Sequence, residues 1–202
     1  RDWFNANKRA YQQAKESFES FLNELIPQIR KFDSSIDMIE PKDCVFRIYR
    51  DIRFSKDKSP YKTNIGGYIA KGGRKSMNPG YYIHLEPGQS FLAGGVYMPA
   101  SDVLKKIREE IYYNVDEFKQ IMHEEDFRKY FDGFEMNEKL KNPPRGFDKE
   151  WPDIDLLKFK GYAVAHPVSD ETVMDPGFLK YSLKVFKELY RLNRFLGRAL
   201  NN

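Results

Sequence analysis

Apolar residues recur at intervals of three and four at both ends of this chain. Between residues 8 and 30 they fall on one face of a helix, with Lys, Glu and Gln between them. The same spacing returns between residues 178 and 196, just after Pro176, a residue suited to a helix start. The pattern predicts a long amphipathic helix at each end, and Pro27 predicts a kink or an early end of the first one.

The apolar period changes to two between residues 45 and 98, which is typical of half-buried strands. Strands are predicted at 45–52, 67–70, 81–86 and 91–98. The Pro87-Gly88 turn joins two of them, so we expect an antiparallel meander. The Gly94-Gly95 pair indicates a bulge or a close approach of another backbone.

Helical spacing resumes after Ser101, which is a candidate N-cap, and again after Asn114. A short helical segment is predicted near 127–134, a brief helix at 153–159 and a further strand at 161–168. Helices before and after a run of strands predict an α+β fold, an antiparallel β-meander flanked by N- and C-terminal amphipathic helices. With 202 residues, the chain fits a single domain, residues 1–202. Trp3 and Phe4 are expected to fold back over the core.

The composition predicts a soluble globular protein, since 41% of residues are apolar and 32% are charged. Cys44 is the single cysteine, which excludes an internal disulfide framework and favours the cytoplasm. No apolar run approaches the roughly 18 residues that cross a bilayer, so no membrane partner is expected. Because the chain does not begin with Met, we expect some native N-terminal residues to precede it.

Positive charge is concentrated in one basic strand-loop segment, residues 47–75. The whole chain carries a net charge of +4, and residues 47–62 alone carry the same excess, with six cations against Asp51 and Asp57. Arginine grips two oxygens at once and lysine adds charge, so clustered cations suit a phosphate-bearing ligand or a nucleic-acid backbone. The candidate ligand-binding residues are Arg47, Arg50, Arg53, Lys56, Lys58 and Lys62. Phe54 and Tyr61 are expected to pin this loop on the core.

Other interpretations of the basic segment remain open. A charged loop can simply be solvated, with Asp51 and Asp57 pairing internally, and it then serves only architecture or a protein partner. Tyrosines at 49, 81 or 82 beside the cations would suit single-stranded nucleic acid, where bases stack on rings. Arg145 lies in a loop with two prolines, where it would reach the same anion site or bond to helix-end carbonyls.

Tyr82, His84 and Glu86 share one face of a predicted strand. A histidine beside a carboxylate can act as a base and its orienting group. This pattern indicates, as an alternative function, a metal-assisted or acid/base phosphoester hydrolase using His84, Glu86 and Asp51, with Asp57 as a further candidate. The opposing interpretation is an ordinary solvent face or a structural pair with Arg47. No metal site is predicted, because no third ligand follows a recognisable metal spacing.

Four segments together resemble one family. They are Trp3-Phe-Asn-Ala-Asn-Lys8, the seventeen residues from Phe46 to Lys62, Gly80-Tyr-Tyr-Ile-His-Leu-Glu-Pro-Gly88, and Pro143-Pro-Arg-Gly-Phe147. The family is domain-of-unknown-function family 2461, found in bacteria and fungi. The resemblance spans nearly the whole chain and implies a single domain, but it implies no catalytic residues.

Overall fold

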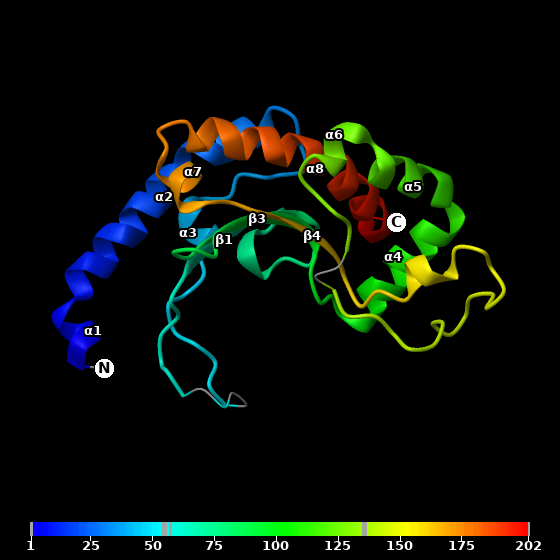
Figure 1. Ribbon diagram of the computed structural model, residues 1–202, viewed down its shortest axis with the longest axis horizontal. Coiled ribbons are helices and arrows are strands. Elements are labelled where there is room, and N and C mark those ends of the chain that lie inside the picture. The colour runs from blue at the N-terminus through cyan, green and yellow to red at the C-terminus, as the bar shows by residue number, and fades with distance from the viewer. Residues whose placement is uncertain (1, 54–55, 57, 135–136, 202) are drawn as a thin grey trace.

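One antiparallel sheet organises the structure, a computed structural model that describes residues 2–53, 56, 58–134 and 137–201. The strands follow the order β1-β2-β3-β4, and helices cover one face of the sheet (Figure 1). The strands are β1 (Ile65–Ile69), β2 (Gly80–Leu85), β3 (Phe91–Val96) and β4 (Tyr162–Pro167). The α+β fold, with a meander flanked by terminal helices, is confirmed.

Two long helices flank the sheet at the ends of the chain, as the periodicity predicts. The helices are α1 (Asp2–Ala6), α2 (Lys8–Arg30), α3 (Pro41–Cys44), α4 (Ser101–Tyr113), α5 (Val115–His123), α6 (Glu125–Arg128), α7 (Asp170–Met174) and α8 (Phe178–Asn201). Two 3-10 helices, η1 (Gly73–Lys75) and η2 (Ile154–Leu157), complete the described elements. Among these described helices, none is both long and apolar enough to cross a bilayer.

Alternate residues of β2 divide between the two faces of the sheet. Tyr81 and Ile83 point to the helix-covered face and are fully buried. The ring of Tyr81 packs against Phe186 of α8, with ring centroids 5.2 Å apart, and its hydroxyl donates to the Asp33 carboxylate at 2.7 Å. The intervening residues, Tyr82 and His84, therefore point to the opposite face, which we call the open face.

Helix α8 docks on the sheet through glycine and asparagine. A Cβ at Gly94 would lie 2.1 Å from Leu189 Cδ2 of α8 and 2.4 Å from the backbone oxygen of Gly80, so the predicted close approach of another backbone at this glycine pair is confirmed. The buried Asn193 amide accepts from Gly95 N and donates to Gly80 O, both at 3.0 Å. The Asn193 side chain therefore links α8 to both β2 and β3. This contact holds α8 against the face of the sheet opposite to the open face.

The predicted strand at 45–52 is wrong. Among the described residues, its backbone pairs at two isolated bridges, Val45 with Gly67 and Tyr49 with Tyr61. Beyond Phe46 no sheet edge lies alongside this segment, because β1 begins at Ile65. The described residues between Phe46 and Lys62 form instead two antiparallel arms, bridged at Tyr49 and Tyr61, which project from the body of the protein and are called here the basic hairpin (Figure 1).

Three predictions at helix ends and at the N-terminus are also wrong. Helix α2 does not end early at Pro27 but continues to Arg30, because buried apolar residues on either side of the proline hold its last turn on the core, and the kink stays a prediction. Ala100, not Ser101, is the N-cap of α4, and it makes no side-chain cap. Trp3 is 76% exposed, and Phe4 stacks on Tyr61 of the basic hairpin at 4.1 Å instead of covering the core.

Candidate functional site

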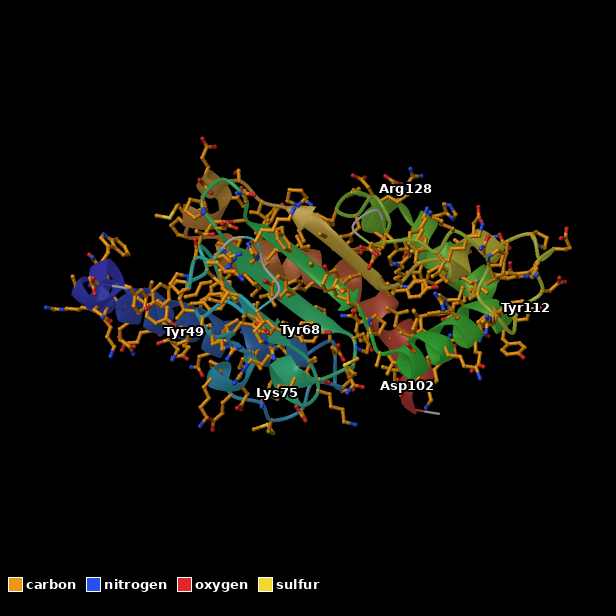
Figure 2. All side chains as sticks on the ribbon, turned by 90° about the horizontal axis from the view of Figure 1, so that it is seen from below. Tyr49, Tyr68, Lys75, Asp102, Tyr112 and Arg128 are labelled. Atoms are coloured by element: carbon orange, nitrogen blue, oxygen red, sulfur yellow. The ribbon has the colours of Figure 1, made fainter. Side chains whose placement is uncertain are left out.

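The open face of the sheet carries a pocket of about 510 Å³, called here the open-face pocket. Small residues of β3 and β4, namely Ala93, Gly95 and Ala163, form its floor. Aromatic rings and polar groups surround this floor: Phe46, Lys62, Asn64, Tyr68, Arg74, Ser76, Asn78, Tyr82, His84 and Phe91. Figure 2 views the molecule from this side, with Tyr68 over the strands and Lys75 on the neighbouring η1.

Tyr68 is held against the pocket floor by its hydroxyl. This hydroxyl donates to Asn78 O at 2.7 Å and lies 3.1 Å from Gly95 O. Burial raises the pKa of Tyr68, so the phenol stays neutral and acts as a donor. The ring therefore presents a fixed flat surface to the pocket.

Lys62 brings a positive charge into the pocket. Its Nζ lies 5.4 Å from the centre of the Phe46 ring, and the side chain is half-buried. Burial, and to a smaller degree the charge of Arg47, lowers the pKa of Lys62. No salt bridge joins Lys62 to a carboxylate in the described part of the chain. A desolvated ammonium of this kind gains from an anion placed beside it.

Arg74 supplies a second positive charge from η1. Gly72 and Gly73 precede it with φ of +83° and +74°, a conformation that favours glycine. A Cβ at Gly73 would lie 2.8 Å from Asp43 O, so this glycine lets the loop pack against α3. Arg74 Nη1 then donates to Lys42 O at 2.8 Å, which positions the guanidinium at the pocket. Within the described residues, Arg74 has no carboxylate partner either.

Tyr82, His84 and Glu86 form a hydrogen-bonded chain along the open face. Tyr82 Oη lies 3.0 Å from His84 Nδ1, and His84 Nε2 lies 3.0 Å from Glu86 Oε2. The Thr63 hydroxyl donates to the other oxygen of the Glu86 carboxylate. The His84 and Glu86 side chains are only 13% and 19% exposed, so both are largely shielded from water.

The protonation states in this chain follow from its partners. The hydrogen bond from Thr63, and then the one from His84, lower the pKa of Glu86, so its carboxylate is ionised and accepts from His84 Nε2–H. In the neutral form of the His84 ring, Nδ1 is then the acceptor. Burial raises the pKa of Tyr82 to about 12, so its phenol is neutral and donates to Nδ1. The chain therefore runs from a hydroxyl through an imidazole to a carboxylate.

Apart from Lys62, the described cations of the basic hairpin do not line the open-face pocket. Arg53 forms a two-point pair with Asp51, at 3.0 Å from Nε and 2.6 Å from Nη2, and this pairing lowers the pKa of Asp51 to about 2. Lys58 Nζ donates to Ile52 O at 2.9 Å. Arg47 and Lys56 are exposed, and Arg50 is half-buried. Phe54 and Asp57 lie outside the described residues.

Three of the predicted site residues, Lys62, Tyr82 and His84, line the pocket, and Glu86 joins them through His84. Asp51 is engaged by Arg53 in the hairpin. Arg145 is exposed on a loop whose Phe147 contacts Tyr112 of α4. Tyr81 is fully buried and cannot stack on a base.

Sequence reasoning missed several pocket residues, namely Asn64, Tyr68, Ser76 and Asn78. Alternation along β1, in which Gly66 and Tyr68 face opposite to Gly67 and Ile69, is a signal for Tyr68. No signal in the sequence marks the two asparagines. No group of three or more His, Cys, Asp or Glu side chains within the described ranges is arranged to hold a metal ion.

The fold and the pocket together define an α+β protein with a cavity in the size range of small-molecule sites. The family described as conserved hypothetical protein (DUF2461) matches residues 1–195, and the chain belongs to this family. The resemblance drawn from the four sequence segments is thereby confirmed. No curated protein and no solved structure matches the chain.

Proposed function

We propose that this protein binds a small phosphorylated organic molecule in the open-face pocket. The observation that carries the proposal is that Lys62 and Arg74 line the pocket while neither forms a salt bridge with a described carboxylate. An anion is the partner that compensates two such charges. The small-residue floor and the flanking rings leave room for a flat, partly apolar group beside the phosphate.

Both cations belong to the basic strand-loop segment 47–75, so the proposal places its anion site within that segment. Within this segment, the proposed anion site lies at the base of the hairpin, where Lys62 is, and at η1, where Arg74 is. A cytoplasmic location remains part of the proposal, since a single cysteine that is buried and free gives no reason to expect an oxidising compartment.

The test is titration calorimetry with inorganic phosphate and with adenosine monophosphate as probes. Lys62→Gln and Arg74→Gln are each expected to weaken binding about tenfold or more, because a hydrogen bond to a charged group contributes about 1.5–3 kcal/mol. The matched control is Lys75→Gln, which removes an exposed charge next to Arg74 without touching the pocket lining. Equal binding by the pocket variants and the control contradicts the proposal, as does no binding by the unaltered protein.

The alternative function is that the basic hairpin binds a nucleic-acid backbone. This second site would lie on the hairpin and not in the open-face pocket. Tyr49 is 55% exposed on this hairpin beside Tyr61, as stacking on a base requires. An Arg50→Ala plus Arg53→Ala variant separates the two sites. Loss of salt-dependent oligonucleotide binding, with phosphate binding intact, assigns nucleic acid to the hairpin. The remaining alternative is a purely structural or protein-binding hairpin. It predicts that the double variant and the unaltered protein do not differ in binding to phosphate or to oligonucleotide.

A further inference from the structure

We propose that Tyr82 is the nucleophile of a phosphoester-cleaving site in the open-face pocket, with His84 as its general base and Glu86 as the residue that positions His84. This inference rests on the proposed function, because the pocket must first hold the phosphate. It goes beyond binding by naming a reaction and the atoms that carry it.

The first support is the order of the three groups. Tyr82 Oη has the imidazole Nδ1 as its acceptor at 3.0 Å, and the opposite nitrogen of that ring donates to a carboxylate, also at 3.0 Å. A hydroxyl, a base and a group that orients the base, each within hydrogen-bond reach of the next, form the usual arrangement of an activated nucleophile. Strand geometry supplies it here, since alternate residues of β2 share one face.

The second support is that each member is held in place. The His84 ring stacks on Phe91 with centroids 4.5 Å apart and an interplanar angle of 12°. Thr63 holds the Glu86 oxygen that His84 does not use. Tyr82 contacts the Phe46 and Phe91 rings, at 6.1 Å and 5.7 Å between centroids. A preorganised constellation of this kind avoids the cost of ordering the groups during reaction.

The third support is that Tyr82 lines the same pocket as the two cations that form no salt bridge with a described carboxylate. Tyr82, Lys62 and Arg74 all line the same cavity. Lys62 and Arg74 would neutralise the phosphate oxygens and stabilise charge that develops on them during transfer. Burial raises the pKa of the Tyr82 phenol to about 12, so its deprotonation needs a base in contact with Oη, and His84 Nδ1 occupies that position.

The reaction balances without a further reactant except water. Tyr82 Oη attacks phosphorus, its proton passes to His84 Nδ1, and the bond from phosphorus to the leaving oxygen breaks. The leaving oxygen, which departs on the side opposite to Tyr82, takes a proton from solvent water, and this releases an alcohol and leaves a phosphoryl group on Tyr82. Water then attacks that phosphorus and gives a proton back to the solvent, while His84 Nδ1–H returns its proton to Tyr82 Oη as phosphate departs. Asp51 has no part in this scheme, because it pairs with Arg53 in the hairpin.

The experiment uses 4-nitrophenyl phosphate as the probe. We expect a burst of about one nitrophenolate per chain, with mass spectrometry finding one added phosphoryl group on Tyr82. Tyr82→Phe abolishes the burst and the adduct, and His84→Gln slows the burst at least about 100-fold. The control is Tyr113→Phe, which alters a ring that is 78% exposed on α4.

The positioning role of Glu86 has its own measurement. Glu86→Gln removes the carboxylate that accepts from His84 Nε2–H and so loosens the orientation of the ring. The burst rate should therefore fall while the affinity for phosphate stays unchanged, whereas a purely structural role would lower both together.

Binding measured on the same samples separates the possible outcomes. Phosphate binding retained in Tyr82→Phe, with the burst lost, supports the proposal. Phosphate binding by the unaltered protein without burst or adduct overturns this inference and leaves the proposed function standing. A burst that survives in Tyr82→Phe also overturns it, and absence of both binding and burst overturns both proposals.

Discussion

Gly66 lies directly against the hydroxyl of Tyr82: a Cβ at residue 66 would lie 2.7 Å from Tyr82 Oη and 3.2 Å from Cζ. The two residues belong to neighbouring strands, and both point to the open face. Because Gly66 has no side chain, the Tyr82 ring can extend over β1 while its hydroxyl stays within 3.0 Å of His84. The hydrogen-bonded chain on β2 therefore depends on a glycine in β1.

Replacing Gly66 by alanine is expected to displace the Tyr82 ring and to break its hydrogen bond to His84. Overpacking of this kind costs about 1–3 kcal/mol of unfolding free energy. Urea denaturation measures the cost, and the NMR signals of the His84 ring nitrogens report the lost hydrogen bond. In a Tyr82→Phe background the same alanine should cost less, since the closest atom is gone. Equal costs in both backgrounds would show that the hydroxyl does not cause the effect.

Replacing Asn193 by leucine is expected to destabilise the fold by about 2–4 kcal/mol. The substitution leaves Gly95 N–H and Gly80 C=O buried without their side-chain partner. Unfolding free energies from chemical denaturation provide the measurement. Arg194→Ala, at the adjacent exposed position of α8, is the control and should change stability by no more than about 0.5 kcal/mol. A leucine variant as stable as the control would mean that the docking of α8 does not need this asparagine.

The alternation of apolar and polar residues predicts which side chains of β2 lie on the open face. It does not predict the structure of the neighbouring segments. Period-two spacing sets Tyr82, His84 and Glu86 on one face, because successive side chains of a strand point to opposite faces. The same spacing at 45–52 is misleading. A strand also needs a partner edge, and β1 begins too late in the chain to provide one beyond Phe46.

The pocket itself depends on contacts between segments distant in sequence, which no local pattern records. Gly66 meets Tyr82 through the register of β1 against β2. Arg74 reaches the pocket because two glycines with positive φ turn the chain back onto α3. The sequence marks this arginine as one charge in a basic segment, and only the packing of Gly73 against Asp43 shows where it points.

The affinity for phosphate should fall on the alkaline side as Lys62 loses its proton. Burial lowers the pKa of Lys62 from 10.5, so its charge, and the attraction to an anion, disappear at a lower pH than for an exposed lysine. Calorimetry at several values between about pH 8 and 10.5 measures this loss, with circular dichroism to confirm that the protein stays folded. Lys62→Arg is the comparison, because a guanidinium stays charged throughout this range. Identical alkaline profiles for the two proteins would remove Lys62 from the site.

Glu86 should stabilise the fold at neutral pH and lose that effect in acid. The hydrogen bonds from Thr63 and His84 lower the pKa of Glu86 below its ordinary 4.5, so the unfolded chain takes up this proton at a higher pH than the folded one. Its contribution is therefore fully present above about pH 4.5 and disappears as the pH falls through the lower pKa of the folded state.

The difference in unfolding free energy between the unaltered protein and Glu86→Gln should accordingly shrink as the pH falls from 7 to below about 4.5. Urea unfolding at several pH values measures it. Glu150→Gln, at an exposed loop position, is the control and should show a difference that varies little with pH. A constant difference for Glu86→Gln would mean that its carboxylate gains nothing from Thr63 and His84, and the chain from Tyr82 to Glu86 would then lack the fixed negative end that sets the tautomer of His84.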